Sequence, residues 1–307
     1  MSWWQAALLG LVEGITEFLP VSSTGHLIIA AALLGLTGPE QKSSVDAFVI
    51  VIQGGAILAV LGLYWRRALA MLRGLAGQNP AGLRVLVNLV IAFVPAAALG
   101  LLLGDAIERR LFHPEPVIFA LAVGGVYMIA IDLWHEGRLV RPGGGRPPRP
   151  SRAGDLEDMT PRDALAVGLL QCVALWPGAS RAMMTITGGL LRGLKPTAAA
   201  EFSFLLGVPT LGAACLYRLW KNLGADPGER NLFDQLGPVA VTIGLVVAAL
   251  SAALSVRWLV GYLGRRGLAA FGWYRILLAI LLLGLVLGRH VVVRPDRPVD
   301  PPAAPVP

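Results

Sequence analysis

The stretch LPVSSTGH (Leu19–His26) is a polar, proline-containing break between two short apolar stretches, and WPGASRAM (Trp176–Met183) is a second one. In each break a proline precedes a serine by three residues: Pro20 and Ser23, then Pro177 and Ser180. Proline and clustered polar residues interrupt helices. We therefore predict two hairpins of short helices, within residues 2–36 and 161–194.

Long apolar stretches occupy most of the remaining chain. They are Val45–Trp65, Leu83–Gly104, Pro116–Trp134, Ala198–Leu219, Leu236–Val256 and Ala269–Gly288, and each approaches the roughly 20 residues that cross a bilayer as a helix. The chain of 307 residues is 55% hydrophobic and 15% charged, against about 45–50% and 25% for soluble domains. We predict an all-α integral membrane protein. Because Glu13 and Glu17 interrupt the first apolar stretch, we expect no cleavable signal peptide.

The net charge of +7 is unevenly distributed. Residues 66–84 and 138–152 contain arginines and no acidic residue, which predicts a cytoplasmic location. Residues 105–115 and 221–234 each balance two basic residues against three acidic ones, so we expect them outside. Membrane topology thus explains the positive charge, and we expect no nucleic-acid partner.

The charges around the second hairpin predict its course through the membrane. An Arg-rich stretch precedes it and Lys195 follows it, so both ends are expected in the cytoplasm and the hairpin is re-entrant. The same reasoning starts the first hairpin outside. We predict two inverted-topology repeats, each a re-entrant broken-helix hairpin followed by three transmembrane helices. The predicted segments are residues 1–140 and 161–293 for the repeats, 141–160 for a Pro-, Gly- and Arg-rich cytoplasmic linker, and 294–307 for a disordered tail.

The polar residues of the first break are candidates for chemistry. Glu13 and Glu17 lie about one turn apart on one helix face, and two acids at membrane depth are costly unless a cation or a proton offsets their charge. A polar cluster follows at an expected helix start, near Ser23 or Thr24: Ser22, Ser23, Thr24 and His26. The free amides and hydroxyls of such a helix start form an anion site.

The second break supplies Ser180 and Arg181, again at an expected helix start. Arginine binds phosphate through two parallel hydrogen bonds, and a buried one needs an anionic partner. Taken singly, the serines fit helix caps, the acid pair fits a structural element, and His26 fits an interior histidine. Their joint occurrence at two similar breaks favours a functional site. Cys172 and Cys215 predict neither a disulfide framework nor a metal site.

Together, EGITEFLPVSSTGH (Glu13–His26) and WPGASRAMMTITGG (Trp176–Gly189) resemble the undecaprenyl pyrophosphate phosphatase family, also called the bacitracin resistance protein BacA family. The resemblance covers nearly the whole chain and fails in the linker and tail. It implies a multi-pass enzyme of the bacterial inner membrane that hydrolyses undecaprenyl (C55) diphosphate to undecaprenyl phosphate and inorganic phosphate. That reaction recycles the lipid carrier for cell-wall synthesis and confers bacitracin resistance. Interlocked inverted repeats, a site open to the periplasm and a need for a divalent cation are also implied.

The resemblance extends to individual residues. The family's acidic motif falls on Glu13 and Glu17, whose oxygens suit Mg²⁺ or Ca²⁺. Its phosphate-binding arginine falls on Arg181, and further substrate-binding candidates are Ser22, Thr24, Ser180 and Thr185. Glu201 matches a family position without a defined role. Two positions depart from the family pattern: Ala182 stands in place of a serine, and Val49 in place of an acidic residue.

Two mechanisms fit these residues. Ser23 attacks with Glu17 or His26 as its base, or His26 attacks or activates water; we favour Ser23. The expected partners are the isoprenyl diphosphate substrate and membrane lipids, with a homodimer as one possible assembly.

Other protein classes fit the pattern less well. A transporter or lipid flippase with inverted repeats would share the architecture, but an arginine facing serine-rich helix starts favours phosphate chemistry. A type 2 phosphatidic acid phosphatase needs a second histidine about six residues after the arginine, where Thr187 stands. A purely structural membrane protein gives Glu13, Glu17 and Arg181 no reason to lie at membrane depth.

Overall fold

The computed structural model describes residues 1–36, 39–135, 154–223 and 237–288. These residues form helices and one isolated β-bridge, between Gly154 and Leu194, and they form no strand. The all-α prediction is therefore confirmed for the described part of the chain. The expected tail, residues 141–153 of the expected linker and residues 224–234 of one expected outer loop lie outside the described residues.

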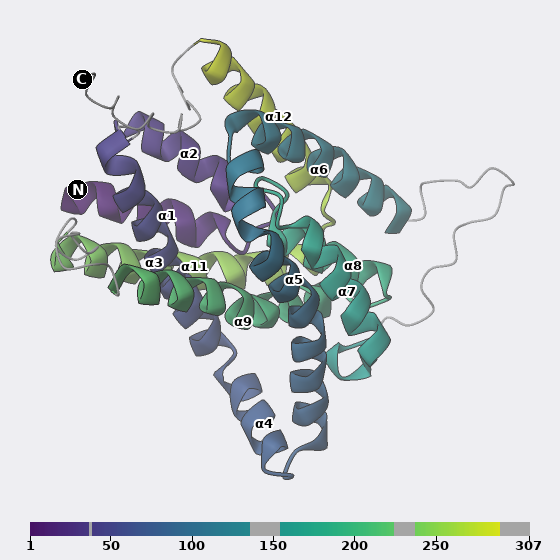
Figure 1. The fold of residues 1–307 in the computed structure, drawn as a ribbon. Coiled ribbons are helices and arrows are strands. Elements are labelled where there is room, and N and C mark those ends of the chain that lie inside the picture. Colours follow the sequence, from purple (N-terminus) through teal and green to yellow (C-terminus); the bar gives the residue numbers. More distant parts are fainter. Residues whose placement is uncertain (37–38, 136–153, 224–236, 289–307) are drawn as a thin grey trace, which may run out of the picture.

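Figure 1 shows how the helices are arranged. They are α1 (Trp3–Thr16), α2 (Ser23–Leu33), α3 (Pro39–Leu63), α4 (Trp65–Leu75), α5 (Pro80–Leu111), α6 (Pro114–His135), the short 3₁₀-helix η1 (Leu156–Asp158), α7 (Pro161–Val173), α8 (Arg181–Leu191), α9 (Pro196–Leu223), α11 (Pro238–Leu263) and α12 (Ala269–Leu287). Each half begins with two short helices and continues with long ones, apart from α4, which has 11 residues.

Among the described residues, five helices are long and apolar enough to cross a membrane: Pro80–Ile107 of α5, Pro114–Trp134 of α6, Pro196–Tyr217 of α9, Pro238–Leu263 of α11 and Ala269–Leu287 of α12. A sixth span arises only if Ala47–Leu63 is taken together with α4, and these two segments are bent by 77°. The chain is thus a multi-pass membrane protein.

Two expected loops are largely helical, which corrects the sequence prediction. The apolar stretch Val45–Trp65 ends as a helix at Leu63, and Arg66, Arg67 and Arg73 belong to α4. Figure 1 shows α4 and the first turns of α5 projecting together from one end of the molecule. Residues 105–111 likewise continue α5. Arginine and leucine are good helix formers, so a change in polarity marks the membrane boundary rather than the end of the helix.

Both predicted hairpins are present as pairs of half-length helices. The helices α1, α2, α7 and α8 have 14, 11, 13 and 11 residues, and at 1.5 Å per residue each reaches at most about 21 Å. The apolar core of a bilayer is about 30 Å thick. None of the four helices spans it alone, and the breaks between them lie inside the protein.

The first helix of each hairpin packs against a long helix of the other half: α1 against α11, and α7 against α5. Small residues permit this close approach, because a Cβ atom at Gly10 would clash with the carbonyl of Gly244, and one at Gly168 with that of Ala92. Ser255 of α11 also donates to the carbonyl of Gly14, at 2.9 Å. This exchange interlocks the halves and brings the two breaks together.

Residues 154–160, expected as part of the linker, are packed against the helices. Leu156 and Met159 are buried in the main hydrophobic cluster, and Asn88 of α5 donates to the carbonyl of Met159 at 2.8 Å. Arg67 of α4 pairs with Glu157 of η1 and, at 2.6 Å, with Glu201 of α9. In the second half of the chain, packing against the helices therefore begins several residues before α7.

Candidate active site

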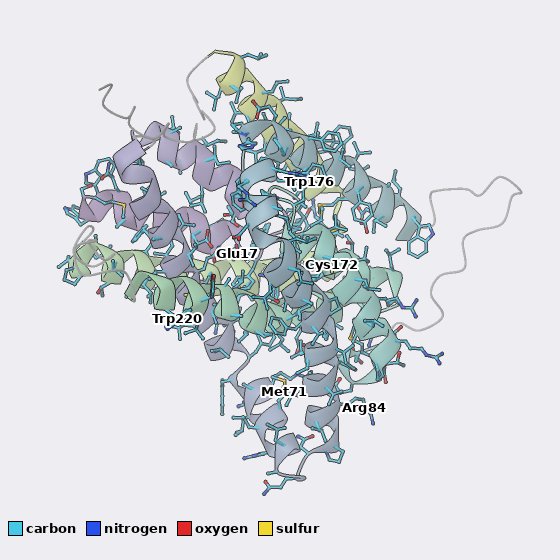
Figure 2. The ribbon with its side chains drawn as sticks, viewed as in Figure 1. Glu17, Met71, Arg84, Cys172, Trp176 and Trp220 are labelled. Carbon is cyan, nitrogen blue, oxygen red and sulfur yellow. The ribbon has the colours of Figure 1, made fainter. Side chains whose placement is uncertain are left out.

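An ion pair joins the two breaks. Arg181, the first residue of α8, donates from Nη2 to Oε1 of Glu17, which closes α1, at 3.2 Å. The two side chains are only 9% and 6% exposed, so water screens this pair little. Figure 2 shows Glu17 near the middle of the molecule, far from Arg84 in the projecting part of α5. The structure thus brings a cation from one hairpin onto an acid from the other.

The other oxygen of Glu17 binds Ser23. Ser23 Oγ donates to Glu17 Oε2 at 2.7 Å, the short distance of a hydroxyl bonded to a carboxylate. Ser23 is half-buried and is the first residue of α2. A serine bonded to an acceptor of its proton has the geometry of an activated nucleophile.

The serine before each of these helices has an unusual backbone. Ser22 has φ 73° and Ser180 has φ 70°, and they are the only residues other than glycine with positive φ in the described ranges. Each accepts a hydrogen bond from the amide three residues later, Gly25 or Met183. Such backbone conformations cost about 1–3 kcal/mol and cluster at functional sites.

These caps correct the alignment of the two breaks. The proline spacing pairs Ser23 with Ser180, whereas the backbone makes Ser22 the counterpart of Ser180. Ser23 and Arg181 therefore occupy equivalent first positions of α2 and α8. The free amides at both helix starts, beside Arg181, form an electropositive region suited to a phosphate group.

Several groups fix the guanidinium of Arg181. Nη1 donates to the carbonyl of Ser203 in α9 at 2.8 Å, and the guanidinium lies 5.2 Å from the ring centre of Phe18. A Cβ atom at Gly207 would lie 2.8 Å from Nη1, so this glycine provides space for the guanidinium. Arg181 Nε is buried and has no hydrogen-bond partner in the described part of the chain. Nε thus remains as a nitrogen that can donate to a ligand.

Thr185 and Ser203 are hydrogen-bonded to Arg181 and to each other. Thr185 Oγ1 donates to the carbonyl of Arg181 at 2.9 Å and lies 2.6 Å from Ser203 Oγ. Both side chains are fully buried. Their hydroxyls therefore bond to protein groups, and Thr24, at the second position of α2, is the more exposed hydroxyl.

Glu13 fits the role of a cation ligand. It is completely buried, and neither of its side-chain oxygens has a hydrogen-bond partner among the described residues. A bare buried carboxylate is costly unless a cation or a proton compensates it. No group of three or more His, Cys, Asp or Glu side chains suited to a metal is found within the described ranges. Two carboxylates suffice for Mg²⁺, which keeps water or substrate phosphate as its other ligands.

His26 is bonded away from the nucleophile. Its Nδ1 lies 2.7 Å from the carbonyl of Ser22, and its Nε2 lies 2.6 Å from the hydroxyl of Tyr274 in α12. A carbonyl only accepts, so Nδ1 carries the proton and Nε2 accepts from Tyr274. In this arrangement neither ring nitrogen is available to Ser23.

Some residues of the site escaped the sequence analysis, namely Ser203, Gly207, Tyr274 and Arg275. Ser203 and Gly207 sit in an apolar stretch and carry no sequence signal of their own. Arg275 does carry one, because it is an ionisable residue inside an apolar span. Glu201, by contrast, pairs with Arg67 and takes no direct part in the contacts around Arg181.

The comparisons with known proteins agree over nearly the whole chain. Residues 6–281 match a family model described as bacitracin resistance protein BacA. An undecaprenyl-diphosphatase of Sorangium cellulosum is 48% identical over 285 residues, which are 93% of this chain and 87% of that protein. Undecaprenyl-diphosphatase 2 of Rhodospirillum rubrum is 48% identical over 279 residues, or 91% of this chain and 93% of the relative. An undecaprenyl-diphosphatase of Polaromonas naphthalenivorans is 44% identical over the same shares.

Proposed function

The chain belongs to the bacitracin resistance protein BacA family, and from this premise we propose that it is an undecaprenyl-diphosphate phosphatase whose active site is the junction of the two hairpins. It hydrolyses a membrane-bound isoprenyl diphosphate and releases the lipid monophosphate and inorganic phosphate. The observation that carries the site assignment is the buried chain of contacts from Arg181 through Glu17 to Ser23.

Substrate binding uses the electropositive side of the junction. The terminal phosphate takes hydrogen bonds from the free Nε of Arg181 and from the amides at the starts of α2 and α8. A phosphate also competes with Glu17 for Nη2 of Arg181 and weakens their ion pair. Glu17 then becomes a better proton acceptor for Ser23, so binding of the anion prepares the nucleophile.

The first chemical step transfers the terminal phosphoryl group to Ser23. The bond from Ser23 Oγ to phosphorus forms while the bond from that phosphorus to the bridging oxygen breaks. Glu17 takes the proton of Ser23 and passes it to the bridging oxygen, which leaves as part of undecaprenyl phosphate. Glu17 is thereby again an ionised base.

The second step releases inorganic phosphate. A water molecule attacks the phosphorus of the Ser23 ester and loses a proton to Glu17, which returns that proton to Ser23 Oγ as the ester bond breaks. Arg181 and the helix amides stabilise the charge on the phosphoryl oxygens in both steps. His26, held by Ser22 and Tyr274, orients the start of α2 instead of acting as the base.

Glu13 and Glu17 are the proposed ligands of a divalent cation, Mg²⁺ or Ca²⁺. Such an ion, when bound, neutralises part of the diphosphate charge. The bare oxygens of Glu13 support this assignment, and Glu13 is the principal ligand because the oxygens of Glu17 already contact Arg181 and Ser23.

The site is proposed to open to the periplasmic side of the inner membrane. The loop charges support an orientation in which the α4–α5 turn faces the cytoplasm, and the reciprocal packing of α1 on α11 and α7 on α5 supports two repeats of opposite orientation. Single cysteines at Gln78 and Phe112, in a chain without Cys172 and Cys215, test this in spheroplasts. An impermeant thiol reagent should label position 112 and spare position 78; the reverse result contradicts the orientation.

The assay that tests the function is release of inorganic phosphate from undecaprenyl diphosphate by the purified protein. We expect Ser23→Ala and Glu17→Gln each to reduce turnover by roughly 10³-fold or more, since they remove the nucleophile or its base. Thr242→Ala, which removes an exposed hydroxyl from α11, is the control and should retain full turnover. Normal turnover in Ser23→Ala would remove Ser23 from the reaction.

A further inference from the structure

Arg275 is a charged residue at the centre of an apolar helix. It lies in α12, within the span Ala269–Leu287, and its side chain is completely buried. Burying a guanidinium costs several kcal/mol unless hydrogen bonds and partial charges compensate it. Both of its Nη atoms bond to backbone carbonyls, so the protein itself holds this guanidinium.

The compensation comes from backbone carbonyls of three elements. Nη2 donates to the carbonyl of Gly178 at 2.8 Å and to that of Ala120 in α6 at 3.0 Å, and Nη1 reaches the carbonyl of Pro20 at 3.5 Å. Pro20 lies in the first break and Gly178 in the second. One side chain thus contacts both breaks from outside the hairpins.

The helices α6 and α12, which hold Arg275 in place, are tightly packed against each other. A Cβ atom at Gly125 of α6 would lie 2.7 Å from the carbonyl of Gly272 in α12, and one at Gly272 would lie equally close to the carbonyl of Gly125. Asp132 of α6 accepts hydrogen bonds from the first amides of α12, those of Leu268 at 2.8 Å and Ala269 at 3.0 Å. The pair of α6 and α12 therefore holds Arg275 at a fixed position.

The contacted carbonyls stand just before the catalytic groups. Pro20 precedes the cap Ser22 by two residues, and Gly178 precedes the cap Ser180 by two residues. Ser23 and Arg181 follow the caps directly. Any movement of one break relative to the other changes the separation between the nucleophile and the phosphate-binding guanidinium, and misplacement by about 1 Å costs roughly 100-fold in rate.

We propose that Arg275 is a positioning residue that sets the spacing between the two breaks and thereby aligns Ser23 with the phosphate held by Arg181. The inference rests on the proposed function and adds a residue that touches neither substrate nor metal. Arginine suits this role because its planar fork directs hydrogen bonds to several carbonyls at once, whereas the ammonium of lysine is a compact point charge.

Two variants test the proposal in the purified full-length protein. Arg275→Lys keeps the charge and loses the fork. Gly124→Ala keeps Arg275 but places a Cβ atom 2.4 Å from its Nη2, which displaces the guanidinium without removing it. The control is Gly284→Ala in α12, because a Cβ atom there meets no other atom within 4 Å. We expect at least a tenfold loss of kcat for Arg275→Lys and Gly124→Ala and none for the control.

A double-variant cycle separates positioning from a merely structural role. Suppose that Arg275 acts by aligning Ser23 with phosphate held by Arg181. Its replacement then matters less once Arg181→Lys has weakened phosphate binding, so the fold-loss of kcat in the double variant is well below the product of the two single fold-losses. If the replacement of Arg275 only reduced the amount of folded protein, the fold-loss in the double variant would equal the product of the two single fold-losses. Multiplying effects, or near wild-type kcat in both Arg275→Lys and Gly124→Ala, overturn the proposal.

The thermal midpoint and the elution volume of each variant establish whether it is folded. If Arg275→Lys misfolds, the kcat of Gly124→Ala tests the proposal. The proposed function is tested separately by Ser23→Ala. If Ser23→Ala keeps normal turnover, the proposed reaction fails. If it is inactive while Gly124→Ala has normal kcat, only the role of Arg275 fails.

Discussion

At the first break Ser22 caps α2 and Ser23 follows; at the second, Ser180 caps α8 and Arg181 follows. The caps share the same unusual backbone. Counting back equally from the two caps, Glu17 corresponds to Leu175 and Glu13 to Gln171, while Gly10 corresponds to Gly168. The two breaks therefore share a backbone conformation at their caps but carry different side chains. In the proposed reaction, the first hairpin supplies the acids and the nucleophile, and the second supplies the guanidinium of Arg181.

The division implies that the site exists only where the hairpins meet. Gly10 and Gly168 make the same close approach to the opposite half, so the packing positions remain symmetric. The polar positions do not. Gln171 is buried like Glu13, with an amide nitrogen that has no partner in the described part of the chain, but it carries no charge. Variants at corresponding positions should therefore have unequal effects.

Among the variants that test this division between the hairpins, the largest effect is expected at Arg181. Arg181→Lys keeps the charge but loses the bidentate geometry and the contact with Glu17, so we expect turnover to fall by roughly 100-fold. The measurement is kcat and KM for phosphate release. Turnover within about threefold of wild type would contradict the assignment of phosphate binding to Arg181 of the second hairpin.

The next effect concerns Glu13. Glu13→Gln keeps the shape and removes one ligand charge, so we expect about a tenfold loss of turnover together with a higher concentration of Mg²⁺ or Ca²⁺ at the half-maximal rate. Titration of either ion into Glu13→Gln and wild type provides the midpoint. An unshifted midpoint removes Glu13 from the metal site, and Glu17→Gln serves as the comparison wherever its residual activity permits.

A smaller effect is expected at Gly207 of α9. A Cβ atom there would lie 2.8 Å from Arg181 Nη1, so Gly207→Ala should displace the guanidinium and lower turnover about five- to tenfold. Gly212→Ala in the same helix is the matched control, because a Cβ atom at Gly212 meets nothing within 4 Å. Both substitutions favour helix formation. Equal turnover in the two variants contradicts the view that Gly207 provides space for Arg181.

The smallest effect is expected at Gln171. Gln171→Met keeps the volume and removes the amide, so turnover should stay within about threefold of wild type while the midpoint for Mg²⁺ is unchanged. A tenfold loss with a shifted midpoint would show that the second hairpin also contributes a ligand, and the division of chemistry between the hairpins would be wrong.

The sequence was sufficient for the parts of the fold that follow from local composition. Apolar length located five of the six predicted spans, while Val45–Trp65 qualifies only together with α4. The prolines and polar clusters located both breaks. The start of α2 at Ser23 is confirmed. The bend between α3 and α4 was not predicted, because Leu63 and Trp65 lie in one continuous apolar stretch and carry no breaking residue between them.

The sequence predicted only those residues of the candidate site whose polar or charged side chains stand out from the apolar sequence around them. Glu17, Ser23 and Arg181 belong to dense polar clusters, and the structure brings them into contact. Ser203 binds Arg181 through its backbone carbonyl, which any residue type offers. Tyr274 meets His26 across almost the whole chain, and that pairing depends on the packing of α12, which no local pattern specifies.

The most direct test of the proposed reaction is detection of a phosphoryl group on Ser23. Wild-type protein turning over undecaprenyl diphosphate is quenched in acid, and the peptide containing Ser23 is examined by mass spectrometry, with Glu17→Gln and Ser23→Ala alongside. We expect phosphoserine at Ser23 in the wild type and at no residue in Ser23→Ala, with far less in Glu17→Gln. Full turnover by Ser23→Ala, with no phosphoserine at Ser23 in the wild type, would contradict the proposed reaction.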